Sequence, residues 1–171
     1  MPLVDVTRTY LEMRSPADLK GGGARVPAGS RLEPVAHVPA SLWRYLYATV
    51  GGPYFWLDRL NWSDAQIREY LARPITLWLL SSGGAPAGFF ELTRNDDRSI
   101  EISYFGLLPD FVGKGLGKYL LVRAIEEAWA TQPTRVWLHT CTLDHPAALP
   151  NYLDRGFSAT STERYQYEIS G

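Results

Sequence analysis

The sequence predicts an α+β fold in which one mixed, mostly antiparallel and twisted sheet of about six to seven strands is flanked by about four helices. Three observations predict it. Short apolar or alternating segments indicate strands over residues 75–81, 87–94 and 99–108, and an amphipathic pattern indicates a helix over residues 115–130. One strand–turn–helix–strand crossover joins these segments at the centre of the chain. We expect residues 1–171 to form a single domain, because this length buries one core without metal or disulfide support.

The N-terminal part of the chain is expected to contribute a strand, a loop and two helices. Residues 4–13 mix alternation with β-branched side chains, which is typical of a strand. Residues 20–34 are rich in glycine and proline and are expected to form a flexible surface loop. A helical pattern begins near Leu42. A second helix begins at Ser63, whose side chain can form a capping box with Gln66.

Turn residues predict the remaining elements. Residues 82–86, Ser-Gly-Gly-Ala-Pro, favour a hairpin turn because glycine tolerates a positive φ. Residues 135–141 are expected to form a strand, and residues 146–155 a short helix that ends at Gly156. Residues 157–169 then supply the closing strand.

Composition excludes several classes of protein. The 17 basic and 18 acidic residues nearly cancel, so no global field would draw the chain to nucleic acid or to a membrane surface. Cys141 is the only cysteine, which excludes a disulfide framework and suits a reducing compartment, so we expect a cytoplasmic protein. The longest apolar run lies around residues 75–80 and is far shorter than the ~20 residues of a membrane helix. The N-terminus lacks the basic start and apolar core of a secretory leader.

A glycine-rich turn between a buried strand and a helix is the main candidate for a binding site. Residues 112–117 are Val-Gly-Lys-Gly-Leu-Gly. Backbone N–H groups at such a helix N-terminus, aided by the helix dipole, form a cradle for phosphate. The spacing does not fit a P-loop, because Lys118 is followed by Tyr119 rather than Ser or Thr. It also does not fit the dinucleotide motif G-x-G-x-x-G.

This turn resembles the pyrophosphate-binding motif of the GNAT (GCN5-related) N-acetyltransferase superfamily, Gln/Arg-x-x-Gly-x-Gly/Ala, with Val112 where Gln or Arg is usual. Residues 147–157 resemble the family's second motif, Ala-x-x-x-Tyr-x-x-x-Gly-Phe. The resemblance covers residues 75–169 and implies the GNAT fold, acetyl-CoA as cosubstrate and no metal. The residues that it implies at the cofactor are Leu107, Val112, Gly113, Lys114, Gly115, Leu116, Gly117, Lys118 and His145.

The resemblance implies direct transfer of an acetyl group to a primary amine of a small molecule or peptide through a tetrahedral intermediate. An alkylammonium of pKa ~10.4 is only about 0.04% neutral at pH 7, so a base is useful. Glu101 is the first candidate, because its strand resembles the one that carries the catalytic glutamate of histone-acetylating members. His139 is its rival, with a pKa near neutrality. Tyr152 matches the tyrosine that protonates the departing thiolate.

Other interpretations stay open. The chain could be a non-catalytic acyl-CoA-binding module on the same fold, since Val112 departs from the motif. His139 and Cys141 alternate along one strand and share a face, which allows a thiol nucleophile and a hydrolase. The aromatic residues could form either an acceptor wall or core packing: Trp43, Tyr45, Tyr47, Tyr54, Phe55, Trp56 and Trp62. A homodimer is allowed by the sequence but not required.

Overall fold

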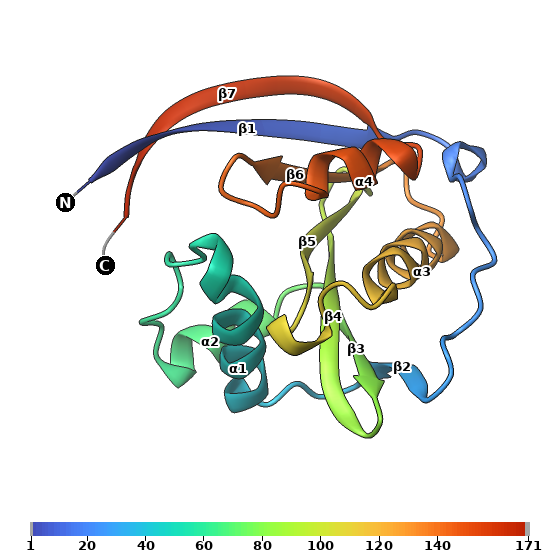
Figure 1. The fold of residues 1–171 in the computed structure, drawn as a ribbon, viewed down its shortest axis with the longest axis horizontal. Helices are drawn as coiled ribbons and strands as arrows, with labels where there is room; N and C mark the ends of the chain where they lie inside the picture. The colour runs from blue at the N-terminus through green and yellow to red at the C-terminus, as the bar shows by residue number, and fades with distance from the viewer. Residues whose placement is uncertain (1, 170–171) are drawn as a thin grey trace.

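The computed structural model describes residues 2–169 and confirms the α+β class (Figure 1). Its seven-stranded sheet has the order β2-β3-β4-β5-β6-β1-β7. The strands are β1 (Leu3–Met13), β2 (Ser30–Val35), β3 (Ile75–Ser82), β4 (Ala85–Arg94), β5 (Ile100–Leu107), β6 (Val136–Cys141) and β7 (Ser158–Glu168). The α-helices of this part of the chain are α1 (Ala40–Gly51), α2 (Asp64–Leu71), α3 (Leu116–Ala130) and α4 (Ala148–Asp154).

The helices lie on both sides of the sheet and bury two separate apolar clusters (Figure 1). Successive side chains of a strand point to opposite faces. Phe89 of β4 accordingly packs with Trp43 of α1 and Ile67 of α2, whereas Phe90 packs with Leu120 of α3. None of the helices within residues 2–169 combines the length and the apolar character that a membrane crossing would need.

Local turn and cap chemistry agrees with the sequence-based expectations. The Ser63 hydroxyl accepts a hydrogen bond from the Gln66 N–H at 3.2 Å, and the Gln66 side chain accepts one from the Ser63 N–H at 2.8 Å. This capping box begins α2. Gly83 and Gly84 form the β3–β4 turn with φ of 59° and 83°. The three central strands β3, β4 and β5 pair antiparallel, as predicted.

The expectation of a loop over residues 20–34 is wrong at its C-terminal end. Ser30–Val35 forms β2 and pairs antiparallel with β3. Leu32 packs against the core from this strand. Pro34 is tolerated because β2 is an edge strand, where one side of the backbone needs no partner.

The N-terminal strand occupies a place in the sheet that its sequence does not predict. β1 lies between β6 and β7 and is antiparallel to both. Its residues 8–13 pair with β6, whereas residues 3–7 pair with β7 alone. The first half of β1 and the second half of β7 therefore form a two-stranded arm that extends beyond β6 (Figure 1).

A gap opens between the strands that the crossover joins. β5 and β6 pair in parallel only at Ile100–Val136 and Glu101–Trp137, and they diverge beyond this point. The β4–β5 ladder also shifts register between Glu91 and Leu92, which leaves Ser103 as a bulged residue. The separation of β5 from β6 leaves the final residues of β5 without a partner on one side and creates room for a ligand.

Gly156 fixes the junction between α4 and β7. Its φ is 108°, and a Cβ placed there would lie 1.9 Å from the carbonyl oxygen of Asp18. We expect Gly156→Ala to lower the free energy of unfolding by about 1–3 kcal/mol, since strain at positive φ adds to this clash. Gly29→Ala is the matched control, because Gly29 has φ of 74° but nothing within 4 Å of its Cβ position. Chemical denaturation of both variants measures the difference, and equal losses would contradict the role of the Asp18 contact.

Candidate functional site

A cavity of about 910 Å³ lies where β5 and β6 separate. Its walls come from β5, the glycine-rich turn, β6, α4, the segment between α1 and α2, and the β1–β7 arm. The predicted site residues that line it are Glu101, Leu107, Val112, Gly113, Gly117, Lys118, His139, His145 and Tyr152. Lys114, Gly115 and Leu116 are not among the lining residues.

The glycine-rich turn has the backbone conformation that a phosphate cradle needs. Gly113 and Gly115 have φ of 81° and 79°, in the left-handed region that favours glycine. A Cβ at either position would meet nothing within 4 Å, so glycine serves the backbone conformation here rather than packing. Gly115 is the N-cap of α3 and offers no side chain to the first helical turn. Within residues 2–169, no side chain therefore caps the N–H groups of that turn, and two of its residues, Gly117 and Lys118, line the cavity.

The neighbours of these glycines anchor the turn. Leu116 is 5% exposed and belongs to the core beneath α3. The ammonium group of Lys114 lies 5.5 Å from the ring of Phe111, outside the cavity lining. Val112, which directly precedes Gly113, lines the cavity and is 41% exposed. Its side chain is apolar. The turn thus offers main-chain donors, with Lys118 as the nearby cation that lines the cavity.

Leu107 contributes a main-chain donor at the end of β5. The next N–H along the strand, that of Leu108, donates to the Ala87 carbonyl at 2.8 Å, toward β4. Successive N–H groups of a strand point to opposite edges. The Leu107 N–H therefore points away from β4, toward the space that β6 has left.

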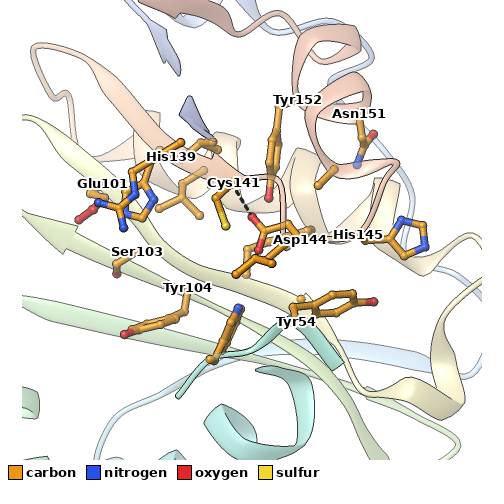
Figure 2. Close-up of a pocket in the computed structure, with 18 of the residues that line it drawn as sticks. Tyr54, Glu101, Ser103, Tyr104, His139, Cys141, Asp144, His145, Asn151 and Tyr152 are labelled. Atoms are coloured by element: carbon orange, nitrogen blue, oxygen red, sulfur yellow. Dashed lines mark hydrogen bonds between the residues drawn. The ribbon is translucent and has the colours of Figure 1, made fainter. Parts of the chain in front are cut away.

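Tyr152 reaches the cavity from α4 (Figure 2). Its ring packs edge-on against Phe105 and Phe157, with centroids 6.4 and 6.2 Å away. Burial, together with the Asp144 carboxylate, raises the pKa of the Tyr152 phenol well above its usual range. The hydroxyl is consequently protonated at neutral pH and can donate a proton or a hydrogen bond into the cavity.

Asp144 and His145 shape the loop that leads into α4. One oxygen of Asp144, Oδ2, accepts hydrogen bonds from the Thr140 hydroxyl at 2.5 Å and from the Cys141 N–H at 3.1 Å. His145 accepts the Ala147 N–H at its Nδ1, 3.0 Å away. Figure 2 shows Asp144 beside Cys141, with its carboxylate near the end of the Tyr152 side chain. The sequence did not indicate this role for Asp144, because its partners are recognisable only from the loop geometry.

Glu101 and His139 lie on one side of the cavity (Figure 2). Burial, and next the Glu91 carboxylate, raise the pKa of Glu101, and Arg59 partly opposes them. The His139 ring is exposed to the cavity and lies 5.6 Å from the ring of Tyr10. The cavity walls around the ring reduce its solvation, which disfavours the charged imidazolium, and the Arg8 guanidinium repels it. Both effects lower the pKa of His139, so this imidazole is neutral at pH 7.

Cys141 shares the cavity-facing side of β6 with His139, as the alternation predicts. Burial, and next the Asp144 carboxylate, raise the pKa of its thiol. A nucleophilic cysteine needs the opposite shift, since the thiolate is the reactive form. The site therefore disfavours the hydrolase interpretation.

A buried polar network beneath the cavity was missed in the sequence. Glu91 of β4 is fully buried, and its carboxylate accepts hydrogen bonds from the Trp43 indole at 3.0 Å, from the Tyr70 hydroxyl and from the Ser103 hydroxyl at 3.3 Å. The network ties α1 and α2 to the bulge in β5. The available clue was an acidic residue inside an otherwise apolar stretch, residues 87–92.

The arm formed by β1 and β7 contributes Arg8, Tyr165 and Tyr167 to the cavity wall. The Tyr167 hydroxyl donates to Asp58 Oδ1 at 3.0 Å, which joins β7 to the segment between α1 and α2. Arg8 forms an ion pair of 3.1 Å with Glu163 and donates to the Tyr165 hydroxyl at 3.3 Å. The aromatic residues that could form either an acceptor wall or core packing fall into two groups. Those that line the cavity are Tyr47, Tyr54, Phe55 and Trp56, whereas Trp43, Tyr45 and Trp62 are not among its lining residues.

Comparison with known proteins decides the family. The model of the acetyltransferase (GNAT) family matches residues 40–157. The chain belongs to this family. An uncharacterized N-acetyltransferase of Mycobacterium tuberculosis is 31% identical over 107 residues, which are 62% of this chain and 68% of the relative. A relative of the same description in Mycobacterium bovis matches equally. The family and the description of these relatives as N-acetyltransferases support an acetyltransferase.

Solved structures agree on the fold of this GNAT protein. A conserved protein of unknown function from Staphylococcus epidermidis has a TM-score of 0.69 at 18% identity over 96% of this chain. The chain spans 61% of that protein and 58% of a GCN5-related N-acetyltransferase from Kribbella flavida, whose TM-score is 0.65 at 22% identity and 96% coverage of this chain. Spermidine N-acetyltransferase from Vibrio cholerae, solved with CoA and spermine, has a TM-score of 0.64 at 18% identity, covering 79% of this chain and 84% of its own.

Proposed function

We propose that the chain transfers an acetyl group from acetyl-CoA to a primary amine, in a reducing compartment such as the cytoplasm. One observation carries the proposal: Gly117 and Lys118, in the first turn of the uncapped helix α3, line the same cavity as Tyr152 and Glu101. CoA in the Vibrio cholerae relative supports this cosubstrate. Spermine in that structure shows only that a related fold accommodates an amine.

The residues of the cavity fit an acyl-CoA. The main-chain donors of residues 113–118 suit its pyrophosphate, and Lys118 adds a positive charge. Bound acetyl-CoA would supply the activated thioester. The N–H of Leu107 points to the space beside β5 and would donate to the thioester oxygen as negative charge develops there.

Proton transfer is assigned to three side chains of the cavity. Glu101 would take the proton of the incoming ammonium through a water molecule, and its raised pKa brings it nearer to neutrality than a solvated carboxylate. His139 is the second candidate, since its imidazole is neutral. Tyr152 would donate its proton to the CoA sulfur as the C–S bond breaks, and the proton that the new amide nitrogen then releases would restore the phenol.

Two measurements test this function. Isothermal titration calorimetry should show binding of acetyl-CoA, and an amine panel should then release free CoA in the presence of the protein. Binding without CoA release for any amine would favour the acyl-CoA-binding module, an alternative motivated by the apolar side chain of Val112 at the turn. An absence of acetyl-CoA binding would contradict both functions.

Glu101 is expected to set the acid limb of the pH profile. A base acts as its carboxylate, so kcat/KM should rise with pH through the raised pKa of Glu101. Glu101→Gln should lower kcat/KM by about 100-fold and remove this limb. Steady-state rates from pH 5 to pH 9 measure both, with His139→Gln as the comparison. An acid limb that survives in Glu101→Gln and disappears in His139→Gln would assign the base to His139.

A further inference from the structure

Arg59, between α1 and α2, brings a positive charge to the cavity. Its Cζ lies 4.5 Å from the ring centroid of Tyr70, 4.6 Å from that of Trp62 and 5.6 Å from that of Tyr104. A guanidinium held near aromatic rings is attracted to them electrostatically while it keeps several N–H donors for other partners. The three rings therefore hold the cation at the cavity, where the Tyr70 hydroxyl engages part of the guanidinium and its other N–H groups can reach a ligand.

Arg59 lacks an anionic partner among residues 2–169, because the ion pairs of this part of the chain do not include it. The buried carboxylate of Glu91 attracts it electrostatically. That carboxylate, however, takes its hydrogen bonds from Trp43, Tyr70 and Ser103. A guanidinium has five N–H donors, so beyond its contact with Tyr70 this half-buried group can still bind a carboxylate of the ligand in a two-point contact.

The size of the acceptor is limited by the bridge beside Arg59. Asp58 precedes it in the chain and accepts the hydrogen bond from Tyr167 of β7 at 3.0 Å. Both residues of this bridge line the cavity, so the bridge joins its two walls. An extended polypeptide could cross this end only if the bridge opened. The bridge between the two walls favours a small molecule over an extended polypeptide.

We propose that the acceptor is a small amine that carries a carboxylate, as in an amino acid, and that Arg59 binds this carboxylate while the amine faces Glu101. The inference rests on the proposed function. Arg59 and Glu101 both line the cavity and interact electrostatically, so one small zwitterion suits both. Binding the carboxylate at a fixed guanidinium restricts the rotation of the acceptor and orients its amine.

Matched acceptors test the proposal with the full chain. Each pair differs only in a carboxylate or its amide: phenylalanine with phenylalaninamide, and 4-aminobutyrate with 4-aminobutyramide. In the wild type, kcat/KM should favour the carboxylate in one pair at least. Arg59→Gln should lower kcat/KM for that carboxylate by about 10- to 100-fold and change the amide by less than about 3-fold. Comparing the ratios between proteins cancels the intrinsic reactivity of each amine.

Two further variants separate recognition from folding and from net charge. Arg59→Lys keeps the charge but loses the planar fork, so it should retain part of the preference. Arg68→Gln removes the same charge from α2 outside the cavity lining, where Arg68 lies 3.9 Å from Asp64, and should keep the full preference. Thermal unfolding shows which variants are folded. Equal losses for carboxylate and amide in Arg59→Gln would indicate a structural role and overturn the inference.

Equilibrium binding tests the carboxylate site without turnover. Calorimetry in the presence of CoA should show that N-acetylphenylalanine binds the wild type more tightly than N-acetylphenylalaninamide does, and that Arg59→Gln loses the difference. This preference in a protein that acetylates no amine would support the carboxylate site and contradict the proposed function. Acetylation of amines without any carboxylate preference would overturn the inference and leave the proposed function intact. Absence of the preference in both assays also overturns it.

Discussion

Tyr152→Phe is expected to lower kcat by about 10²- to 10⁴-fold while the affinity for acetyl-CoA changes little. The CoA thiolate leaves with a pKa of ~8.5, and a positioned phenol can protonate it as the bond breaks. Phenylalanine keeps the edge-on packing against Phe105 and Phe157 but has no proton to donate. The loss should therefore appear in kcat rather than in cofactor binding. Steady-state kinetics and calorimetry with acetyl-CoA separate the two quantities.

Tyr119→Phe is the matched control for this prediction. Tyr119 lies on α3, is 8% exposed and belongs to the apolar core, and it is not among the cavity-lining residues. Removal of its hydroxyl should leave kcat within about 3-fold of the wild type. A Tyr152→Phe variant as active as the Tyr119→Phe control would remove Tyr152 from the mechanism and leave water as the proton source for the thiolate.

Structural elements that depend on residues close together in the sequence are predictable from it. The capping box at Ser63 and the glycine turn at Gly83 follow from residues a few positions apart, and the structure confirms both. The place of β1 depends instead on pairing with residues more than a hundred positions away, such as Arg8 with Cys141. Alternation indicates a strand but does not name its neighbours. The same limit explains why the glycine- and proline-rich composition of residues 20–34 predicts a loop throughout. Only the pairing with β3 shows that its last residues form the strand β2.

The residues of the candidate site also fall into two groups, those in contiguous sequence motifs and those brought together only by the fold. The glycine turn and Tyr152 are contiguous motifs, so a resemblance could indicate them, and the structure brings both to one cavity. The stacked Arg59 and the buried Glu91 belong to no motif. Trp43 and Glu91 are 48 positions apart in the hydrogen bond that joins them. Such residues emerge only when the packing of α1 and α2 on the sheet is known.

Glu91→Ala is expected to have the largest effect on stability, a loss of about 3–5 kcal/mol in the free energy of unfolding. Glu91 is 0% exposed and accepts hydrogen bonds from an indole and two hydroxyl groups. Each buried donor left without an acceptor costs about 1–3 kcal/mol. Glu91→Gln keeps the volume but turns an NH₂ group toward these donors, so it should lose less, about 1–3 kcal/mol. Chemical denaturation measures both, and a loss below ~0.5 kcal/mol in Glu91→Ala would contradict the network.

The pH dependence of the stability difference between wild type and Glu91→Gln tests whether the Glu91 carboxyl group titrates in the folded protein. Burial raises the pKa of Glu91 in the folded protein above its unfolded value, because the charged form is poorly solvated there. The stability gained from protonation is fully present below the unfolded pKa of ~4.3 and is lost as pH rises through the raised folded pKa. The difference in unfolding free energy between wild type and Glu91→Gln should accordingly shrink as pH rises, because glutamine does not titrate. A difference that stays constant from pH 4 to pH 9 would show that Glu91 acts through shape and neutral hydrogen bonds alone.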